Sequence, residues 1–218
     1  MEVGVTLERA LEIANQYPLA KKEEKLPLMM ASGRILYSDL KSKVDDPRFD
    51  NSAMDGWAVR EADCKEEGTI LRIVGTSQAG SEEIPIVGSG EACKIMTGAQ
   101  IPEGADAIVM VEDSTTQPNN VTINGPARPG FIRRKGENLA QGTVALSSGT
   151  VLTPACISLA ATMGYADVSV VGKPKIAVIG VGDELTPPGE PLSESSIYES
   201  NTFGISSLVE KMGGPQMQ

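Results

Sequence analysis

The sequence contains no histidine. This absence excludes a Ser-His-Asp triad, a histidine-ligated metal centre and a histidine that acts as a general base. Any catalysis by this chain must therefore use carboxylates, hydroxyls, lysine or arginine. Any bound cation must be one that prefers oxygen ligands, such as Mg²⁺.

Cysteine is also scarce. The three cysteines, Cys64, Cys93 and Cys156, are scattered along the chain without Cys-x-x-Cys spacing. This pattern indicates neither a disulfide framework nor a zinc site. We expect these side chains to be buried thiols.

Long hydrophobic runs are missing as well. No segment approaches the roughly 20 consecutive apolar residues that a membrane-spanning helix requires, and residues 1–4 have no basic, apolar signal pattern. With 19 basic and 29 acidic residues the net charge is −10, which opposes attraction to nucleic acid and to anionic lipid. We therefore expect a cytoplasmic protein that binds neither nucleic acid nor membranes.

The most informative segment that is present is a polar turn at residues 49–57, with the sequence FDNSAMDGW. Asn, Ser, Asp and Gly favour turns, and Gly56 tolerates left-handed dihedrals. A purely structural turn is the simpler interpretation, because loops of this composition mostly do no chemistry. Met54 and the single tryptophan, Trp57, favour a second interpretation, in which Asp55 faces a partly desolvated cleft where its charge matters.

The first half of the chain predicts two helices and then strands. Thr6 can cap a helix that ends before Pro18, and a second short helix is expected at residues 28–36. From residue 41 onward, short apolar runs alternate with Gly, Pro and Asn, which indicates an all-β insert. The expected strands are residues 57–60, 70–74, 92–96, 107–111 and 121–123.

The second half predicts a return to helical structure. Two short strands are expected within residues 142–152, and Thr153 and Pro154 then begin a helix that ends at Gly164. The apolar run at residues 175–180 is typical of a strand buried on both faces of a parallel sheet. A last helix is expected from a cap at Ser200 to a stop at Gly213 and Gly214, with its apolar face formed by Ile205, Leu208, Val209 and Met212.

Four segments of the sequence carry a family resemblance. Residues 50–59, DNSAMDGWAV, resemble the signature DNSAMDGYAV of the MoeA / gephyrin E-domain family, the molybdopterin molybdenumtransferases; Trp57 stands where that pattern has Tyr. Three further segments resemble the same family in the same order: residues 95–106 (IMTGAQIPEGAD), 132–138 (IRRKGEN) and 179–185 (IGVGDEL). Four ordered matches are far more specific than any one of them.

The resemblance implies an elongated multidomain chain of the α/β plus mainly-β class. Its expected parts are a discontinuous helical/β linker and dimerisation domain at residues 1–40 and 136–172, and an inserted β domain at residues 41–135. Residues 173–218 are then the first strand and helix of a molybdopterin-binding α/β domain. Family members continue well beyond this point, so we expect the chain to hold only the truncated start of that domain.

The resemblance also implies an activity. The family inserts molybdenum from molybdate into adenylylated molybdopterin and releases AMP with the help of a divalent cation, here expected to be Mg²⁺. The implied assembly is a homodimer whose cleft lies between the β insert of one subunit and the α/β domain of the other. The molybdopterin adenylyltransferase is a further candidate partner.

Two acids are the candidate catalytic and metal-binding residues. Asp55 is interpreted as a Mg²⁺ ligand or an electrostatic positioner, the alternative being an acceptor that only shapes its turn. By resemblance, Asp55 and Thr97 meet Glu184 across the dimer interface. Thr97 follows an apolar strand, where a turn can present N–H groups to an anion, and it is a candidate substrate contact; the alternative is a hydroxyl that bonds its own backbone.

The remaining candidate substrate contacts are Ser52, Arg133, Arg134, Asn138 and Asp183. Arg133 and Arg134 begin the only run of three basic residues in the chain. Such a run suits an oxyanion, the alternative being a solvated surface or an interdomain salt bridge.

Three positions depart from the family pattern. Asn138 stands where family members commonly carry an acid, Val181 where they usually carry Thr, and Glu199 where their IxDSN turn has Asp. A dinucleotide-binding interpretation of residues 180–184 is rejected, because the third glycine is missing and Pro187 and Pro188 follow.

Two hypotheses about function follow. In the first, the chain belongs to a molybdenumtransferase and is weak or inactive alone, because further binding segments of the family lie outside it. In the second, it is a noncatalytic dimerisation or docking scaffold related to the gephyrin E domain.

Overall fold

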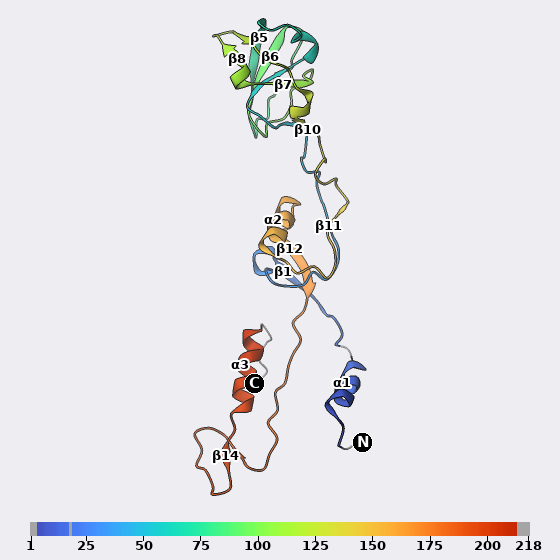
Figure 1. Ribbon diagram of the computed structural model, residues 1–218, viewed down its shortest axis with the longest axis vertical. Helices are drawn as coiled ribbons and strands as arrows, with labels where there is room; N and C mark the ends of the chain where they lie inside the picture. Colours follow the sequence, from blue (N-terminus) through green and yellow to red (C-terminus); the bar gives the residue numbers. More distant parts are fainter. Residues whose placement is uncertain (1–3, 18, 213–218) are drawn as a thin grey trace.

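The computed structural model describes residues 4–17 and 19–212. The chain is mixed α/β and is extended along one axis (Figure 1). A curled six-stranded sheet lies at one end, a smaller unit built around α2 lies in the middle, and α1 and α3 lie towards the other end.

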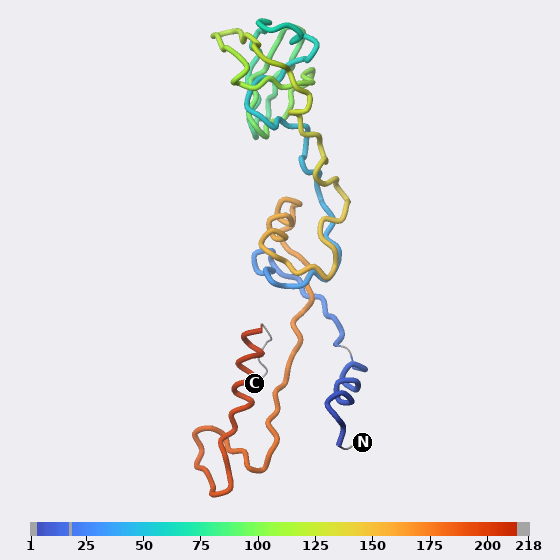
Figure 2. The backbone as a smooth tube through the Cα atoms, in the orientation of Figure 1, coloured from blue at the N-terminus to red at the C-terminus, as the bar shows by residue number. Residues whose placement is uncertain are grey.

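Three regions are named here by their residues. The β lobe is residues 51–133, and the central lobe is residues 23–41 together with 144–171. The neck is residues 42–50 and 134–143, and Figure 2 shows its two segments running side by side between the lobes. Backbone hydrogen bonds join them, for example from the N–H of Asp46 to the carbonyl of Leu139 at 2.9 Å. The domain boundaries stated from the sequence stay predictions.

The β lobe contains one mixed sheet with the strand order β7-β4-β6-β5-β9-β8. β5 and β6 are parallel, and the other neighbours are antiparallel. Five strands coincide with the short apolar runs of the sequence, which confirms those predictions: β4 Gly56–Val59, β5 Thr69–Ser77, β6 Glu91–Ile95, β7 Ala107–Met110 and β9 Asn120–Ile123. The sixth strand, β8 (Ser114–Thr116), has no apolar run and was not predicted. Single 3₁₀ turns at Glu61–Asp63 and Val111–Asp113 separate strands of this sheet, and a third at Pro129–Phe131 follows it.

β4 is buried along its whole length and separates two apolar clusters. Trp57 and Val59 belong to one cluster, and Ala58, between them in sequence, belongs to the other. This alternation follows from the two-residue side-chain period of a strand. Trp57 is only 1% exposed, and its indole N–H donates to the hydroxyl of Ser114 at 3.0 Å. The tryptophan is therefore a core residue of the β lobe.

The central lobe is held by two strands distant in sequence, with α2 packed on them. β1 (Glu23–Pro27) pairs antiparallel with β12 (Asp167–Val171). α2 (Pro154–Thr162) begins and ends as predicted: the hydroxyl of Thr153 accepts the backbone N–H of Cys156 at 3.3 Å, and Gly164 takes a φ of +86° beyond its end. β2 (Leu40–Lys41) pairs with β11 (Val144–Leu146) beside this unit.

One prediction for the central lobe is wrong, and another is confirmed only in part. Residues 28–36 form only a single 3₁₀ turn, Leu28–Met30, because Gly33 adopts a φ of +75° and the N–H of Leu36 donates to Thr150 instead of continuing a helix. Of the two strands expected in residues 142–152, the first is β11. The second is an isolated bridge between Ile35 and Val151.

α1 (Leu7–Asn15) confirms the first predicted helix, with the hydroxyl of Thr6 accepting the N–H of Arg9 at 3.3 Å. Its predicted stop at Pro18 lies outside the described residues. The helix buries none of its residues, and Leu7 is 72% exposed. No helix in the described part of the chain is long and apolar enough to cross a bilayer.

The segment after the central lobe differs from its prediction. Residues 175–180 are extended and mostly exposed, with Ile179 78% exposed, so they are not a strand buried on both faces. Such burial needs paired strands and covering helices on both sides, which the described residues do not provide here. β13 (Leu185–Thr186) and β14 (Ile197–Tyr198) form a short parallel pair.

α3 (Asn201–Lys211) confirms the last predicted helix but not its cap. Ser200 occupies the N-cap position without a side-chain hydrogen bond, and a carboxylate oxygen of Glu199 accepts the N–H of Thr202 at 2.7 Å instead. The predicted stop at Gly213 and Gly214 lies outside the described residues.

Candidate functional site

The signature turn of residues 50–55 joins the neck to the β lobe. β3 (Asn51–Ser52) pairs with β10 (Ile132–Arg133), and Figure 1 places β10 where the lobe meets the neck. A second loop, residues 97–101, lies against the other side of β3, since Asn51 bridges to Gln100. Three of the four motifs that carry the family resemblance thus meet at one end of the β lobe.

Asp55 and Thr97 are brought together by these two loops. One carboxylate oxygen of Asp55, Oδ1, accepts both the backbone N–H of Thr97 at 2.6 Å and its hydroxyl at 2.8 Å. These bonds stabilise the charged form, so they hold the pKa of Asp55 below its usual value, the backbone N–H being the larger cause. Asp55 is therefore ionised near neutral pH.

The described residues of a single chain form no desolvated cleft around Asp55, where the sequence predicted one. Asp55 is exposed and Met54 is 37% exposed, whereas Trp57 points into the core. The tryptophan is explained by packing, so it is not a wall of a ligand site. The N–H of Thr97 is already bonded to Asp55, and the role of Thr97 as a substrate contact stays a prediction.

Ser52, another candidate contact, lies beneath the turn and is only 1% exposed. Its hydroxyl donates to the carbonyl of Met54 at 2.6 Å. The hydroxyl is thus buried and bonded to backbone in one copy of the chain, and the role of Ser52 as a substrate contact stays a prediction.

The basic run at residues 133–135 is paired with acids. The guanidinium of Arg134 donates to Asp50 at 2.7 Å, and the backbone N–H of Lys135 donates to the other oxygen of the same carboxylate at 2.8 Å. Arg133 donates to Glu137 at 3.0 Å, and the backbone N–H of Arg134 donates to Glu137 at 2.7 Å. The salt-bridge alternative thus describes the contacts within one chain, and the roles of Arg133 and Arg134 as substrate contacts stay predictions.

The pairing continues along the neck. The ammonium of Lys135 lies 3.4 Å from Asp45, which also accepts the backbone N–H of Gln141 at 2.8 Å. The side-chain amide of Asn138 donates to Asp46 at 3.0 Å. Asn138 therefore acts as a donor between the two neck segments, a contact that an acid at this position could make only if protonated.

Three neck carboxylates consequently have lowered pKa values. The main cause is a backbone N–H in each case: that of Lys135 for Asp50, that of Arg134 for Glu137 and that of Gln141 for Asp45. A lowered folded pKa means that the stabilisation is complete above the ordinary pKa of about 4 and is lost as the pH falls through the folded value.

We therefore expect the neck to loosen in acid before the β lobe does. Amide protection factors of residues 42–50 and 134–143 should fall as the pH drops below about 4, while those of the β4 to β7 strands stay high. Hydrogen-exchange NMR measures both in one sample. Parallel loss of protection in neck and sheet would contradict this assignment.

Asp183 and Glu184 lie far from Asp55 in the same chain. Both are exposed and directly precede β13, and Figure 1 shows the paired strand β14 at the opposite end of the molecule from the β lobe. The carbonyl of Glu184 accepts the N–H of Ile197 at 2.8 Å, which fixes the start of β13. One copy of the chain therefore does not bring the two candidate catalytic acids together.

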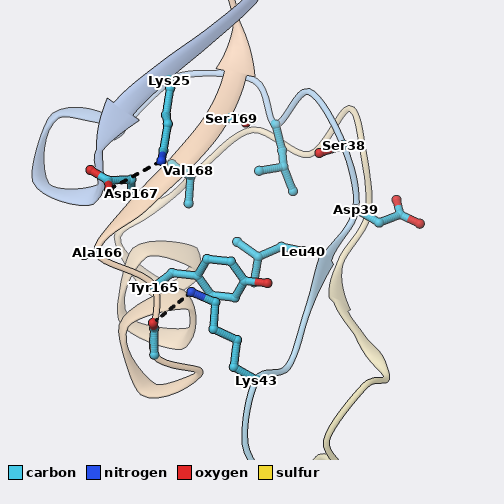
Figure 3. Close-up of a pocket in the computed structure, with 12 residues that line it drawn as sticks. Lys25, Ser38, Asp39, Leu40, Lys43, Tyr165, Ala166, Asp167, Val168 and Ser169 are labelled. Carbon is cyan, nitrogen blue, oxygen red and sulfur yellow. Dashed lines mark hydrogen bonds and ion pairs between the residues drawn. The ribbon is translucent and has the colours of Figure 1, made fainter.

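A pocket of about 440 Å³ in the central lobe has polar walls, but its lysines are already occupied (Figure 3). Lys25 lies 3.9 Å from Asp167. Lys43 donates to the carbonyl of Gly164 at 3.2 Å, and its ammonium lies 3.8 Å from the centre of the Tyr165 ring. These contacts explain both cations without a ligand.

The three cysteines are free thiols. Burial raises the pKa of Cys64 and of Cys93 to about 11, and the carboxylates of Asp63 and Asp106 add to the shift of Cys64. Hydrogen bonds from Thr153 lower the pKa of Cys156. Full burial is confirmed for Cys93, whereas the other two side chains are half-buried.

Sequence reasoning missed the acids that neutralise the basic run. Asp50 lies 85 positions before Lys135, and Asp45 lies still further from it, so no local spacing reveals them. Only the i, i+4 spacing of Arg133 and Glu137 was visible. Asn51 was missed too. Its side-chain oxygen is buried and has no hydrogen-bond partner among the described residues.

Comparison with known proteins decides the family. Residues 5–164 match the family described as MoeA N-terminal region (domain I and II). The chain belongs to this family. It is 40% identical over 214 residues to a molybdopterin molybdenumtransferase of Haemophilus influenzae, a match that covers 95% of this chain and 52% of the relative. It is 39% identical over 193 residues to molybdopterin molybdenumtransferase 2 of Mycobacterium tuberculosis, covering 86% of this chain and 48% of the relative.

The fold is also that of solved MoeA structures. The crystal structure of the molybdopterin biosynthesis MoeA protein from Pyrococcus horikoshii matches with a TM-score of 0.83 and 34% identity, over 96% of this chain and 55% of that one. The chain thus spans about half the length of the relatives that it matches. The resemblance stated from four motifs is confirmed at the level of the family.

Proposed function

We propose that this protein acts in molybdenum cofactor biosynthesis and inserts molybdenum from molybdate into adenylylated molybdopterin, with release of AMP. The observation that carries the proposal is the family match over residues 5–164. It is supported by the similarity to relatives that are named molybdopterin molybdenumtransferase. The family signature coincides with the place where Asp55 and Thr97 pair at the surface of the β lobe.

The geometry of this pair suits binding of a polar ligand. Oδ1 of Asp55 accepts both bonds from Thr97, while Oδ2 accepts none from the described residues. An ionised carboxylate has spare acceptor capacity on its second oxygen. Because a bare carboxylate repels phosphate and molybdate, we assign Oδ2 to a donor group of the pterin substrate or to a cation that lies between the charges.

We propose further that the working pocket is shared by two copies of the chain. Within one copy the β lobe and β13 lie at opposite ends (Figure 1), so Asp55 and Glu184 can cooperate only if they come from different subunits. Exposed apolar side chains on both terminal helices offer surface for such an assembly; Leu11 is 56% exposed and Phe203 is 62% exposed. The assembly that we propose is a homodimer.

Mg²⁺ is the cation that the family implies. The described residues of one copy of the chain do not supply a ligand set that fits it. The described residues contain no group of three or more acids or cysteines that could hold a metal ion. Mg²⁺ prefers about six oxygen ligands in octahedral geometry, and Asp55 alone offers one free carboxylate oxygen. We therefore assign no reaction step to Mg²⁺.

AMP release tests the proposed function. The chain is incubated with adenylylated molybdopterin, molybdate and Mg²⁺, beside the Haemophilus influenzae relative, and we expect the shorter chain to turn over more slowly. Asp55→Asn should lower the rate by about 100-fold, the scale typical of removing one electrostatic group from a catalytic site. Where turnover is too slow to measure, the wild-type chain and Asp55→Asn are compared by titration with adenylylated molybdopterin. The variant should then bind the substrate more weakly.

Asp63→Asn is the matched control. Asp63 lies in the same lobe and also accepts a backbone N–H, from Gly90 at 2.9 Å, and a hydroxyl, from Ser89 at 3.3 Å. This substitution should leave rate and affinity unchanged. If the chain forms a dimer that neither binds the substrate nor responds to Asp55→Asn, the noncatalytic scaffold is the correct function instead.

A further inference from the structure

The hydroxyl of Ser52 holds both backbone polar groups of the residue that precedes Asp55. It donates to the carbonyl of Met54 at 2.6 Å and accepts the N–H of Met54 at 3.3 Å. A side chain that closes such a local ring fixes the path of the following residue. Because Ser52 is only 1% exposed, water cannot easily replace these bonds.

The backbone of Ser52 is tied to the loop that carries Thr97. Its N–H donates to Ala99 at 3.0 Å, and its carbonyl accepts the N–H of Gly98 at 2.8 Å. The same residue thus sets the position of the Thr97 loop through its main chain and that of Asp55 through its side chain. Asp55 and Thr97 lie close together because the loops that carry them are both hydrogen-bonded to Ser52.

We infer that Ser52 is a positioning residue for the Asp55–Thr97 pair. Its hydroxyl orients residues 53–55 so that Oδ1 of Asp55 lies within bonding distance of both donors of Thr97. The role of this pair in binding the substrate rests on the proposed function. The hydrogen bonds that form the pair are independent of that function. This role is indirect and needs no contact between Ser52 and the substrate.

The competing explanation is that Ser52 only stabilises the fold. Ser42 separates the two explanations, because it builds the same local ring elsewhere. Its hydroxyl bonds the carbonyl of Val44 and accepts the N–H of Val44 at 3.4 Å, and Ser42 is 3% exposed. Ser42 lies in the neck and contacts Met163 of the central lobe, not the Asp55 loop.

The test is amide NMR of the whole 218-residue chain. The Thr97 N–H donates a short bond to a carboxylate, so its proton should resonate downfield and exchange slowly in the wild type. Ser52→Ala should move this proton upfield and speed its exchange by about tenfold, the effect of losing one net hydrogen bond. Ser42→Ala should leave the Thr97 signal in place even if it lowers overall stability.

The Asp55 backbone keeps one anchor in these variants, because its carbonyl still accepts the N–H of Val111 at 3.1 Å. Should Ser52→Ala nevertheless fail to fold, Ser52→Cys fills the same volume with a weaker hydrogen-bonding group and should give an intermediate Thr97 shift. An unchanged Thr97 amide in either folded variant overturns the inference, as does an equal change in Ser42→Ala.

These outcomes are separate from those of the proposed function. Suppose that the Thr97 amide signal changes in Ser52→Ala, but the chain neither binds adenylylated molybdopterin nor releases AMP. The proposed activity would then be rejected and the positioning role kept. If Ser52→Ala releases AMP normally and its Thr97 amide signal is unaltered, the proposed activity is kept and the positioning role is rejected.

Discussion

Gly56→Ala is expected to unfold the β lobe. A Cβ at this position would lie 2.0 Å from the carbonyl oxygen of Val109 and 3.1 Å from the Cα of Met110. Both atoms belong to the backbone of β7, which is hydrogen-bonded to β4, so neither can move without separating the strands. We expect a loss of about 3 kcal/mol or more in the free energy of unfolding, at the upper end of overpacking effects.

Urea unfolding followed by Trp57 fluorescence measures this effect, because the indole is buried next to the altered residue. Gly130→Ala is the matched control in the same lobe, since a Cβ there would have no heavy atom within 4 Å and its φ is not left-handed. The control should change stability by no more than about 0.5 kcal/mol. A native-like midpoint for Gly56→Ala would refute the close packing of β4 on β7.

Mixing two inactive variants is expected to restore activity. If Asp55 and Glu184 act in one pocket but come from different subunits, Asp55→Asn and Glu184→Gln should each be inactive alone. In a two-fold dimer, a mixed pair then has one site with both changes and one site with neither. After equal mixing and subunit exchange, about a quarter of the wild-type AMP release should return, since half of the dimers are mixed and each has one intact site.

The control for this experiment is the double variant Asp55→Asn/Glu184→Gln, mixed with the Asp55→Asn variant. No dimer in that mixture has an intact pocket, so no activity should return. Sedimentation of each sample shows whether subunits associate at all. Recovery that fails although mixed dimers form would exclude a pocket built from these two acids.

The sequence predicted the elements whose signals are local. The cap at Thr153, the proline after it and the left-handed Gly164 mark α2 within the segment 153–164, and the structure agrees. The strands of the β lobe are apolar runs bounded by turn residues, which is also local information. The proximity of Asp55 and Thr97 was predicted from the family resemblance of the motifs that contain them.

Features that depend on distant partners were not predictable. β1 has the charged sequence EEKLP, and it becomes a strand because β12, far along the chain, pairs with it. Residues 175–180 have the composition of a buried strand, but the described part of the chain gives them no sheet to enter. Likewise the pairing of Arg134 with Asp50 joins residues 84 positions apart, which no window of sequence contains.

The course of the neck has a consequence for how this protein can be rearranged. Its outgoing and returning segments are bonded to each other, as at Asp46 and Leu139, so the entrance and exit of the β lobe are neighbours in space. Segments with adjacent ends tolerate transplantation. The lobe is therefore a natural cassette, which one recombination event with two junctions at the neck can exchange between relatives while the core around α2 keeps its own contacts.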